Sequence, residues 1–199
     1  MKLIALTITL AFIILACGCS STSSSTRSTT APATTVSTTA PATTVSTPVQ
    51  TLKQESSSIG ERNAANKALS YLRSSSFSRD GLIKQLEYEG FSHKEAVYGV
   101  DQSGADWNKQ AALKAASYLR SSSFSRSGLV DQLEYEGFTP QQAEYGVAQS
   151  GADWNEQAAK KAASYLRTSS FSRSRLIDQL EYEGFTPQQA EYGVRAVGY

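Results

Sequence analysis

The chain has 199 residues, of which 40% are hydrophobic and 19% are charged, and its formal net charge is +1. Residues 61–199 carry 16 basic and 17 acidic side chains, whereas a nucleic-acid-binding domain normally shows a basic excess. Both cysteines, Cys17 and Cys19, lie in the first twenty residues, which excludes a disulfide or a cysteine-based metal site in the rest of the chain.

The amino terminus has the pattern of a secretory signal. A short cationic start precedes an apolar run over residues 3–16, which is too short to span about 30 Å of hydrocarbon as a helix rising about 1.5 Å per residue. Ile14–Cys17 resembles the lipobox of bacterial lipoproteins, where the cysteine thiol takes a diacylglycerol. We expect a lipoprotein signal peptide at 1–16 and a lipid on Cys17, with Cys19 as the alternative site; a plain secretory signal is the competing interpretation.

Residues 17–60 are expected to form the lipidated terminus and a disordered stalk rich in Ser, Thr, Pro and Ala. The nine residues STTAPATTV at 28–36 recur at 37–45. With almost no apolar bulk, such a segment cannot offset the entropy lost on ordering. It would span roughly 35 Å as a coil and up to about 120 Å when extended. The composition predicts a spacer, and glycosylation of the stalk stays open.

The rest of the chain repeats with a period of 47 residues. The segment QLEYEGF at 85–91 recurs unchanged at 132–138 and 179–185. We therefore predict an all-α fold of three tandem helix-turn-helix-like repeats with three helices each. The predicted repeats are residues 61–108, 109–155 and 156–199.

The first segment of each repeat predicts a helix with one side made of small apolar residues. In the second repeat the spacing i, i+3, i+4 and i+7 is met by Ala112, Ala115, Ala116 and Leu119. We expect this stripe to be buried and to let neighbouring helices approach closely. Asp153 followed by Glu156 fits a capping box at the start of the helix, and Asp106 offers the cap without the glutamate.

Two shorter helices should follow in each repeat. In the first repeat the second helix begins after a cap at Ser78 and ends at Gly90, which tolerates a left-handed turn. Ser92 and Glu95 form a capping box for the third helix. The corresponding residues are Ser125, Gly137, Thr139 and Gln142 in the second repeat and Ser172, Gly184, Thr186 and Gln189 in the third.

The repeat YLRSSSFSRDGLIKQLEYEGFS at 71–92, together with SGADWN at 103–108, resembles that of the Ltp-type host-cell-surface-exposed lipoproteins. The resemblance covers residues 64–199, and the signal, lipobox and polar spacer match the layout of that family. It implies an all-α helix-turn-helix repeat anchored on the membrane of a Gram-positive cell, facing outward. It also implies superinfection exclusion, in which a prophage-encoded lipoprotein blocks DNA injection by related phages through contact with the tail tape-measure protein.

The triplet Glu-Tyr-Glu at the end of each second helix is the candidate protein-binding site. At 100° per residue Tyr88 lies nearly opposite Leu86, so it can face outward, and an aromatic beside carboxylates suits a basic, partly apolar segment of a partner. The alternative, favoured by the five aromatic residues of each repeat, is that Tyr88 packs under the third helix or against the next repeat. The candidate residues are Glu87, Tyr88, Glu89, Glu134, Tyr135, Glu136, Glu181, Tyr182 and Glu183.

Other conspicuous residues favour structural roles. Arg73 and Arg79 could contact phosphates, but pairing with nearby glutamates or with the carboxyl end of the first helix is the preferred interpretation. Trp107 and Trp154 are expected to pack between repeats rather than form a carbohydrate platform. His93 occurs in one repeat only, so a function shared by the repeats cannot depend on it.

These patterns together predict a binding protein. The sequence shows no Ser/His/Asp or Cys/His set, metal-ligand cluster or phosphate loop, so we expect no catalytic residues, metal, cofactor, small-molecule substrate or nucleic-acid partner. The expected partners are the membrane, through the lipid, and a protein, which the resemblance implies to be the phage tape-measure protein. The alternative function is adhesion at the cell surface or cell wall, unrelated to phage.

Overall fold

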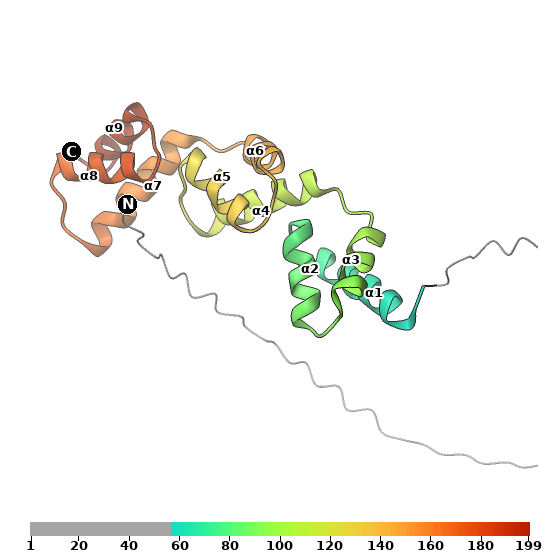
Figure 1. Ribbon diagram of the computed structural model, residues 1–199. Helices are drawn as coiled ribbons and strands as arrows, with labels where there is room; N and C mark the ends of the chain where they lie inside the picture. The colour runs from blue at the N-terminus through green and yellow to red at the C-terminus, as the bar shows by residue number, and fades with distance from the viewer. Residues whose placement is uncertain (1–56) are drawn as a thin grey trace, which may run out of the picture. The chain divides into compact units, whose positions relative to one another are not determined.

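The computed structural model describes residues 57–199, which contain nine α-helices and no strand (Figure 1). Cys17, Cys19 and the predicted signal peptide and stalk lie outside the described residues. The helices are α1 (Ile59–Ser74), α2 (Arg79–Tyr88), α3 (His93–Gln102), α4 (Trp107–Ser121), α5 (Arg126–Tyr135), α6 (Pro140–Gln149), α7 (Trp154–Thr168), α8 (Arg173–Tyr182) and α9 (Pro187–Ala196). The predicted all-α fold with three tandem three-helix repeats is confirmed.

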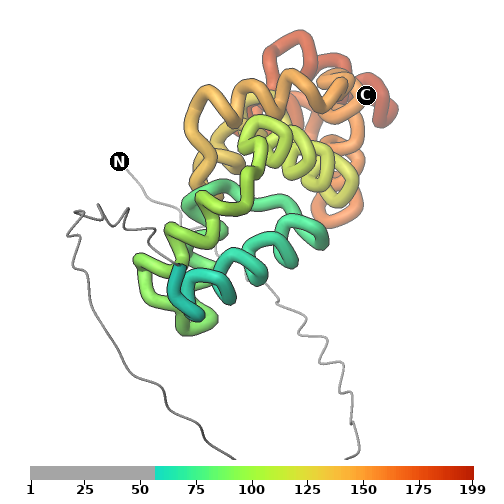
Figure 2. Tube along the Cα trace, turned by 90° about the vertical axis from the view of Figure 1, so that its right-hand side faces the viewer, coloured from blue at the N-terminus to red at the C-terminus, as the bar shows by residue number. Residues whose placement is uncertain are grey.

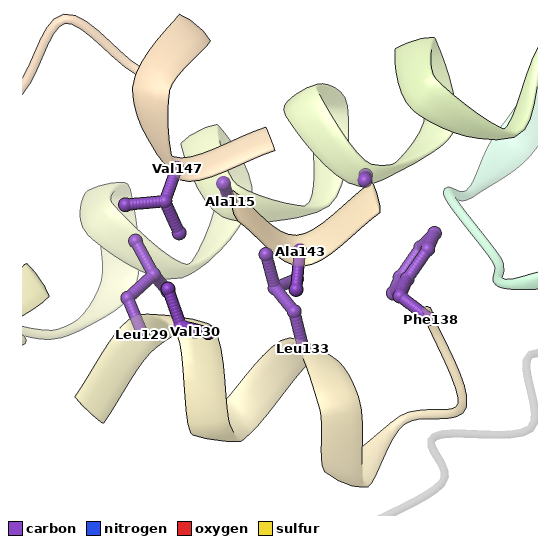
Figure 3. Packing of buried hydrophobic residues seen from close by; sticks show 8 residues of the cluster. Ala115, Leu129, Val130, Leu133, Phe138, Ala143 and Val147 are labelled. Atoms are coloured by element: carbon purple, nitrogen blue, oxygen red, sulfur yellow. The ribbon is translucent and has the colours of Figure 1, made fainter. Parts of the chain in front are cut away.

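Each repeat folds around a hydrophobic core of its own. In every repeat the chain turns back twice, so that the first and third helices lie in contact and the second packs against both (Figure 2). Figure 3 shows the core of the second repeat, where side chains from α4, α5 and α6 converge. Its fully or almost fully buried members are Ala111, Ala115, Leu129, Val130, Leu133, Phe138, Ala143 and Val147.

The first and third helices of a repeat touch at their backbones. A Cβ atom added to Gly146 of α6 would lie 2.7 Å from the carbonyl carbon of Ala111 in α4. Only glycine fits so close a crossing. The same approach joins Gly99 to Ala64 and Gly193 to Ala158.

This crossing corrects the predicted alanine stripe. Ala111 and Ala115 are fully buried, whereas Ala112 and Ala116 are only partly buried. The buried face is therefore shifted toward Ala111, whereas Ala115 and Leu119 of the predicted stripe do pack in the core. The reason is that the third helix packs over Ala111, and its position could not be read from the first helix alone.

Helix ends follow the predicted signals closely. Ser78, Ser125 and Ser172 each accept a hydrogen bond from a main-chain N–H of the helix they precede. The three predicted capping boxes of the third helices are present. Asp153 caps α7, but its predicted partner Glu156 forms an ion pair with Lys160 at 2.8 Å instead of closing the box.

A further capping box joins Ser58 and Glu61 at the start of α1, which the sequence analysis did not predict. The main-chain N–H of Ser58 donates to the Glu61 carboxylate at 2.7 Å. This bond, supported by Lys94, holds the pKa of Glu61 below its usual value.

Each second helix ends in a Schellman turn. Gly90 has a φ of 94°, its N–H donates to the carbonyl of Glu87, and the N–H of Phe91 donates to the carbonyl of Leu86. Tyr88 is the last helical residue before this turn. The second and third repeats end α5 and α8 in the same way.

Candidate protein-binding surface

The second helix of every repeat ends in a tyrosine that projects into solvent. Tyr88, Tyr135 and Tyr182 expose 86%, 88% and 80% of their surface, more than any other large hydrophobic residue in the described part of the chain. Leu86, two residues before Tyr88, is fully buried, as expected for positions on nearly opposite sides of a helix. The alternative in which Tyr88 packs under the third helix or against the next repeat is therefore wrong.

The second glutamate of each triplet is engaged inside its own repeat. In the second repeat the hydroxyl of Tyr118 donates to Glu136, and the ammonium of Lys114 lies 2.6 Å from the same carboxylate. Gln132 Nε2 donates to the Tyr118 hydroxyl at 3.2 Å. We call these four side chains the tyrosine clasp. It ties the first helix of the repeat to the second.

The tyrosine clasp recurs in all three repeats. Its members are Lys67, Tyr71, Gln85 and Glu89 in the first repeat and Lys161, Tyr165, Gln179 and Glu183 in the third. In each copy the lysine ammonium also lies between 5.2 and 5.6 Å from the centre of the tyrosine ring. The sequence analysis missed the clasp. The signal was there, since a Lys, Tyr, Gln and Glu spaced by 4, 14 and 4 residues recur with each period.

In the third repeat the clasp raises the pKa of its tyrosine. Burial raises the pKa of Tyr165 to about 12, and the hydrogen bond to Glu183 adds to the effect. A phenol that donates to a carboxylate would lose this bond on ionisation. Tyr165 therefore keeps its hydrogen bond to Glu183 to a higher pH than an ordinary tyrosine would.

The first glutamate of each triplet differs from the second. Glu134 and Glu181 are exposed beside Tyr135 and Tyr182. Glu87 lies 2.6 Å from Nδ1 of His93, the histidine found in the first repeat alone. Each candidate triplet is consequently divided: the tyrosine and the first glutamate face solvent, while the second glutamate belongs to the clasp.

Three segments of the chain match the sequence model of one protein family, described as host cell surface-exposed lipoprotein. The matched segments are residues 61–102, 106–149 and 153–197, one for each repeat. The chain belongs to the host cell surface-exposed lipoprotein family. This confirms the resemblance seen in the sequence. No curated protein and no solved structure matches the chain.

No helix within residues 57–199 of this surface-exposed lipoprotein is long and apolar enough to cross a membrane. The same residues hold no group of three or more His, Cys, Asp or Glu side chains arranged to bind a metal ion.

The arginines at the start of the second helices form ion pairs in this lipoprotein. Arg79 lies 2.7 Å from Asp101 of α3. Arg126 pairs with Glu144 of α6, and Arg173 pairs with Glu191 of α9. Arg73 lies in the last turn of α1, where a cation complements the helix dipole. These positions agree with the structural interpretation of the arginines.

Trp107 and Trp154 each begin the first helix of their repeat, and each packs against the core of the preceding repeat. Trp107, the first residue of α4, lies against the core of the first repeat. Trp154, the first residue of α7, lies against that of the second repeat. In the third repeat Val197 packs against the core near the end of the chain.

Proposed function

We propose that this surface-exposed lipoprotein excludes superinfecting phages by binding the tail tape-measure protein through its exposed tyrosines, which blocks DNA injection. The observation that carries the proposal is the threefold exposure of Tyr88, Tyr135 and Tyr182 at equivalent helix ends. A surface location of the family supports it, because incoming phage components meet the cell surface first.

The chemistry of the three sites favours a protein partner. Tyrosine offers a large, rigid contact surface and a hydroxyl at a small entropic cost, which makes it a frequent energetic centre of protein interfaces. The neighbouring Glu134 and Glu181 add negative charge and thus favour a basic segment. Three copies on one chain raise the effective affinity for a partner that engages more than one of them. On this proposal the protein acts by contact and not by catalysis.

The test uses the full chain with Tyr88, Tyr135 and Tyr182 all replaced by alanine. We expect phage adsorption to stay unchanged and DNA entry to rise to the level of cells without the protein. The matched control is Leu113→Ala, which removes an apolar side chain with 48% exposure from α4 and should leave protection intact. Protection that survives deletion of residues 61–199 would contradict the proposal. A change in adsorption alone would favour the alternative, a cell-surface or cell-wall adhesin.

We also propose that Cys17 carries the lipid, with Cys19 as the alternative. The arrangement Ile14–Cys17 after the apolar run supports Cys17. Metabolic labelling with palmitate should be lost in Cys17→Ser and kept in Cys19→Ser. The opposite result would move the lipid to Cys19, and label that persists when both cysteines are replaced would argue against cysteine acylation.

A further inference from the structure

The repeats contact each other through a hydrogen bond that occurs twice. The hydroxyl of Ser78 donates at 2.5 Å to the main-chain carbonyl of Glu136 in the next repeat. Ser125 makes the same bond to Glu183, also at 2.5 Å. Both serines are the caps of their second helices and are almost fully buried, with exposures of 1% and 2%.

Glycine stands beside each of these bonds. A Cβ atom on Gly81 would lie 3.2 Å from the Glu136 carbonyl oxygen, and one on Gly128 would lie 3.4 Å from that of Glu183. Each would also lie within 3.0 Å of the capping serine hydroxyl. A Cβ atom would therefore be tight against the carbonyl at Gly81 and at contact distance from it at Gly128.

Each junction joins two unlike faces. The donor face consists of the capping serine of the second helix and the residue three places after it. The acceptor face consists of the glutamate carbonyl at the C-terminal end of the second helix and the glycine and phenylalanine that follow. The acceptor faces of the second and third repeats contact the preceding repeat, and their Phe138 and Phe185 are each only 3% exposed. Phe91, on the acceptor face of the first repeat, is only partly buried. Ser172, on the donor face of the third repeat, is exposed.

Within residues 57–199, each chain consequently keeps one unused face of each kind. The acceptor face of the first repeat consists of Glu89, Gly90 and Phe91, and a Cβ atom on Gly90 would meet nothing within 4 Å. The donor face of the third repeat carries Ser172. Because the two faces are those that pair within the chain, they are complementary between two chains, and copies could join head to tail into filaments.

The third repeat differs from the others at the position three residues after the capping serine. Where the first two repeats have Gly81 and Gly128, it has Arg175, which is exposed and lines an open hollow together with Ser172 and Tyr182. We propose that Arg175 closes the donor face of the third repeat and so prevents a second copy of the chain from docking its first repeat there. Capping repeats with a polar outer face have this role in other repeat proteins.

Arg175→Gly in the full chain tests this proposal. The substitution should fold, because the first two repeats carry glycine at the same place in α2 and α5. Sedimentation in a density-matched detergent should give a single-chain species for the parent protein at all concentrations. The Arg175→Gly protein should form dimers and longer species as its concentration rises. Circular dichroism should show equal helix content in both.

Two further variants locate the contact. Arg175→Ala keeps a Cβ atom and should associate less than Arg175→Gly. Adding Ser172→Ala to Arg175→Gly removes the hydroxyl donor and should reduce association. The proposal is overturned if Arg175→Gly stays a single chain, if the parent protein associates to the same degree, or if Ser172→Ala has no effect on the association.

Discussion

In each repeat, one tyrosine of the first helix and one tyrosine at the end of the second helix have opposite surroundings. Tyr118 lies within the tyrosine clasp, where it donates to Glu136 and packs at 5.6 Å, edge to face, against Phe124. Tyr135, the residue before Glu136, is 88% exposed. The comparison teaches that residue type does not decide which tyrosine is structural. Its place in the fold does, because Tyr118 of α4 reaches Glu136 at the end of α5, whereas Tyr135 on α5 faces solvent.

The largest expected difference is between Tyr118→Ala and Tyr135→Ala. Tyr118→Ala removes a packed ring and the clasp hydrogen bonds, and should lower the free energy of unfolding of the second repeat by about 2–4 kcal/mol. Tyr135→Ala removes an exposed ring and should change it by less than about 0.5 kcal/mol. Hydrogen exchange at the amides of α4 and α5 measures both. Equal effects would mean that the clasp is not structural.

A smaller difference is expected between the two glutamates of one triplet. Glu136→Gln weakens the bond from Tyr118 and removes the ion pair with Lys114, at a cost of about 1–2 kcal/mol. Glu134→Gln, at an exposed position, should cost less than about 0.5 kcal/mol. Chemical denaturation of the two variants distinguishes them. If Glu134→Gln were the more destabilising, our division of the triplet would be wrong.

Alkaline pH should weaken the clasp of the third repeat. The pKa of Tyr165 is raised to about 12 in the folded protein, above the ordinary value of 10. The unfolded state therefore loses its proton first, so the stabilisation is complete below pH 10 and is lost as the pH rises from 10 to 12. Tyr165→Phe should flatten this part of the stability curve, measured by thermal unfolding of the third repeat, and Tyr182→Phe should not. An unchanged slope in Tyr165→Phe would assign the alkaline transition to another group.

The smallest effect on stability is expected from breaking an exposed ion pair between two helices. The ion pair of Arg126 and Glu144 also ties two helices of the second repeat, but both side chains are 50% exposed. Glu144→Ala should cost at most about 1 kcal/mol, because solvent screens an exposed pair. Measured in the same way as Glu136→Gln, it should be the milder change. A larger cost would show that these exposed pairs carry more of the fold than the clasp.

Much of the local structure could be predicted from the sequence because its signals are local. The capping serines, the capping boxes and the left-handed turn at Gly90 each depend on a few neighbouring residues. The alanine stripe was misplaced because the buried face of α4 depends on Gly146, which lies more than thirty residues later. The exposure of Tyr88 was left open for the same reason, since helix phase gave its direction but not what covered it.

The sequence by itself determined the threefold period, most of the helix ends and the family, because the repeats are visible in the residues themselves and capping depends on adjacent residues. Tertiary structure alone decided which glutamate of each triplet joins the clasp, since Glu136 is bound by Lys114 and Tyr118 from another helix. It also decided the meaning of Gly81, Gly128 and Arg175, which look like ordinary variation until the next repeat is seen to place a carbonyl oxygen against the first two. Contacts between segments distant in the chain exist only once the chain has folded, and they assign these residues their roles.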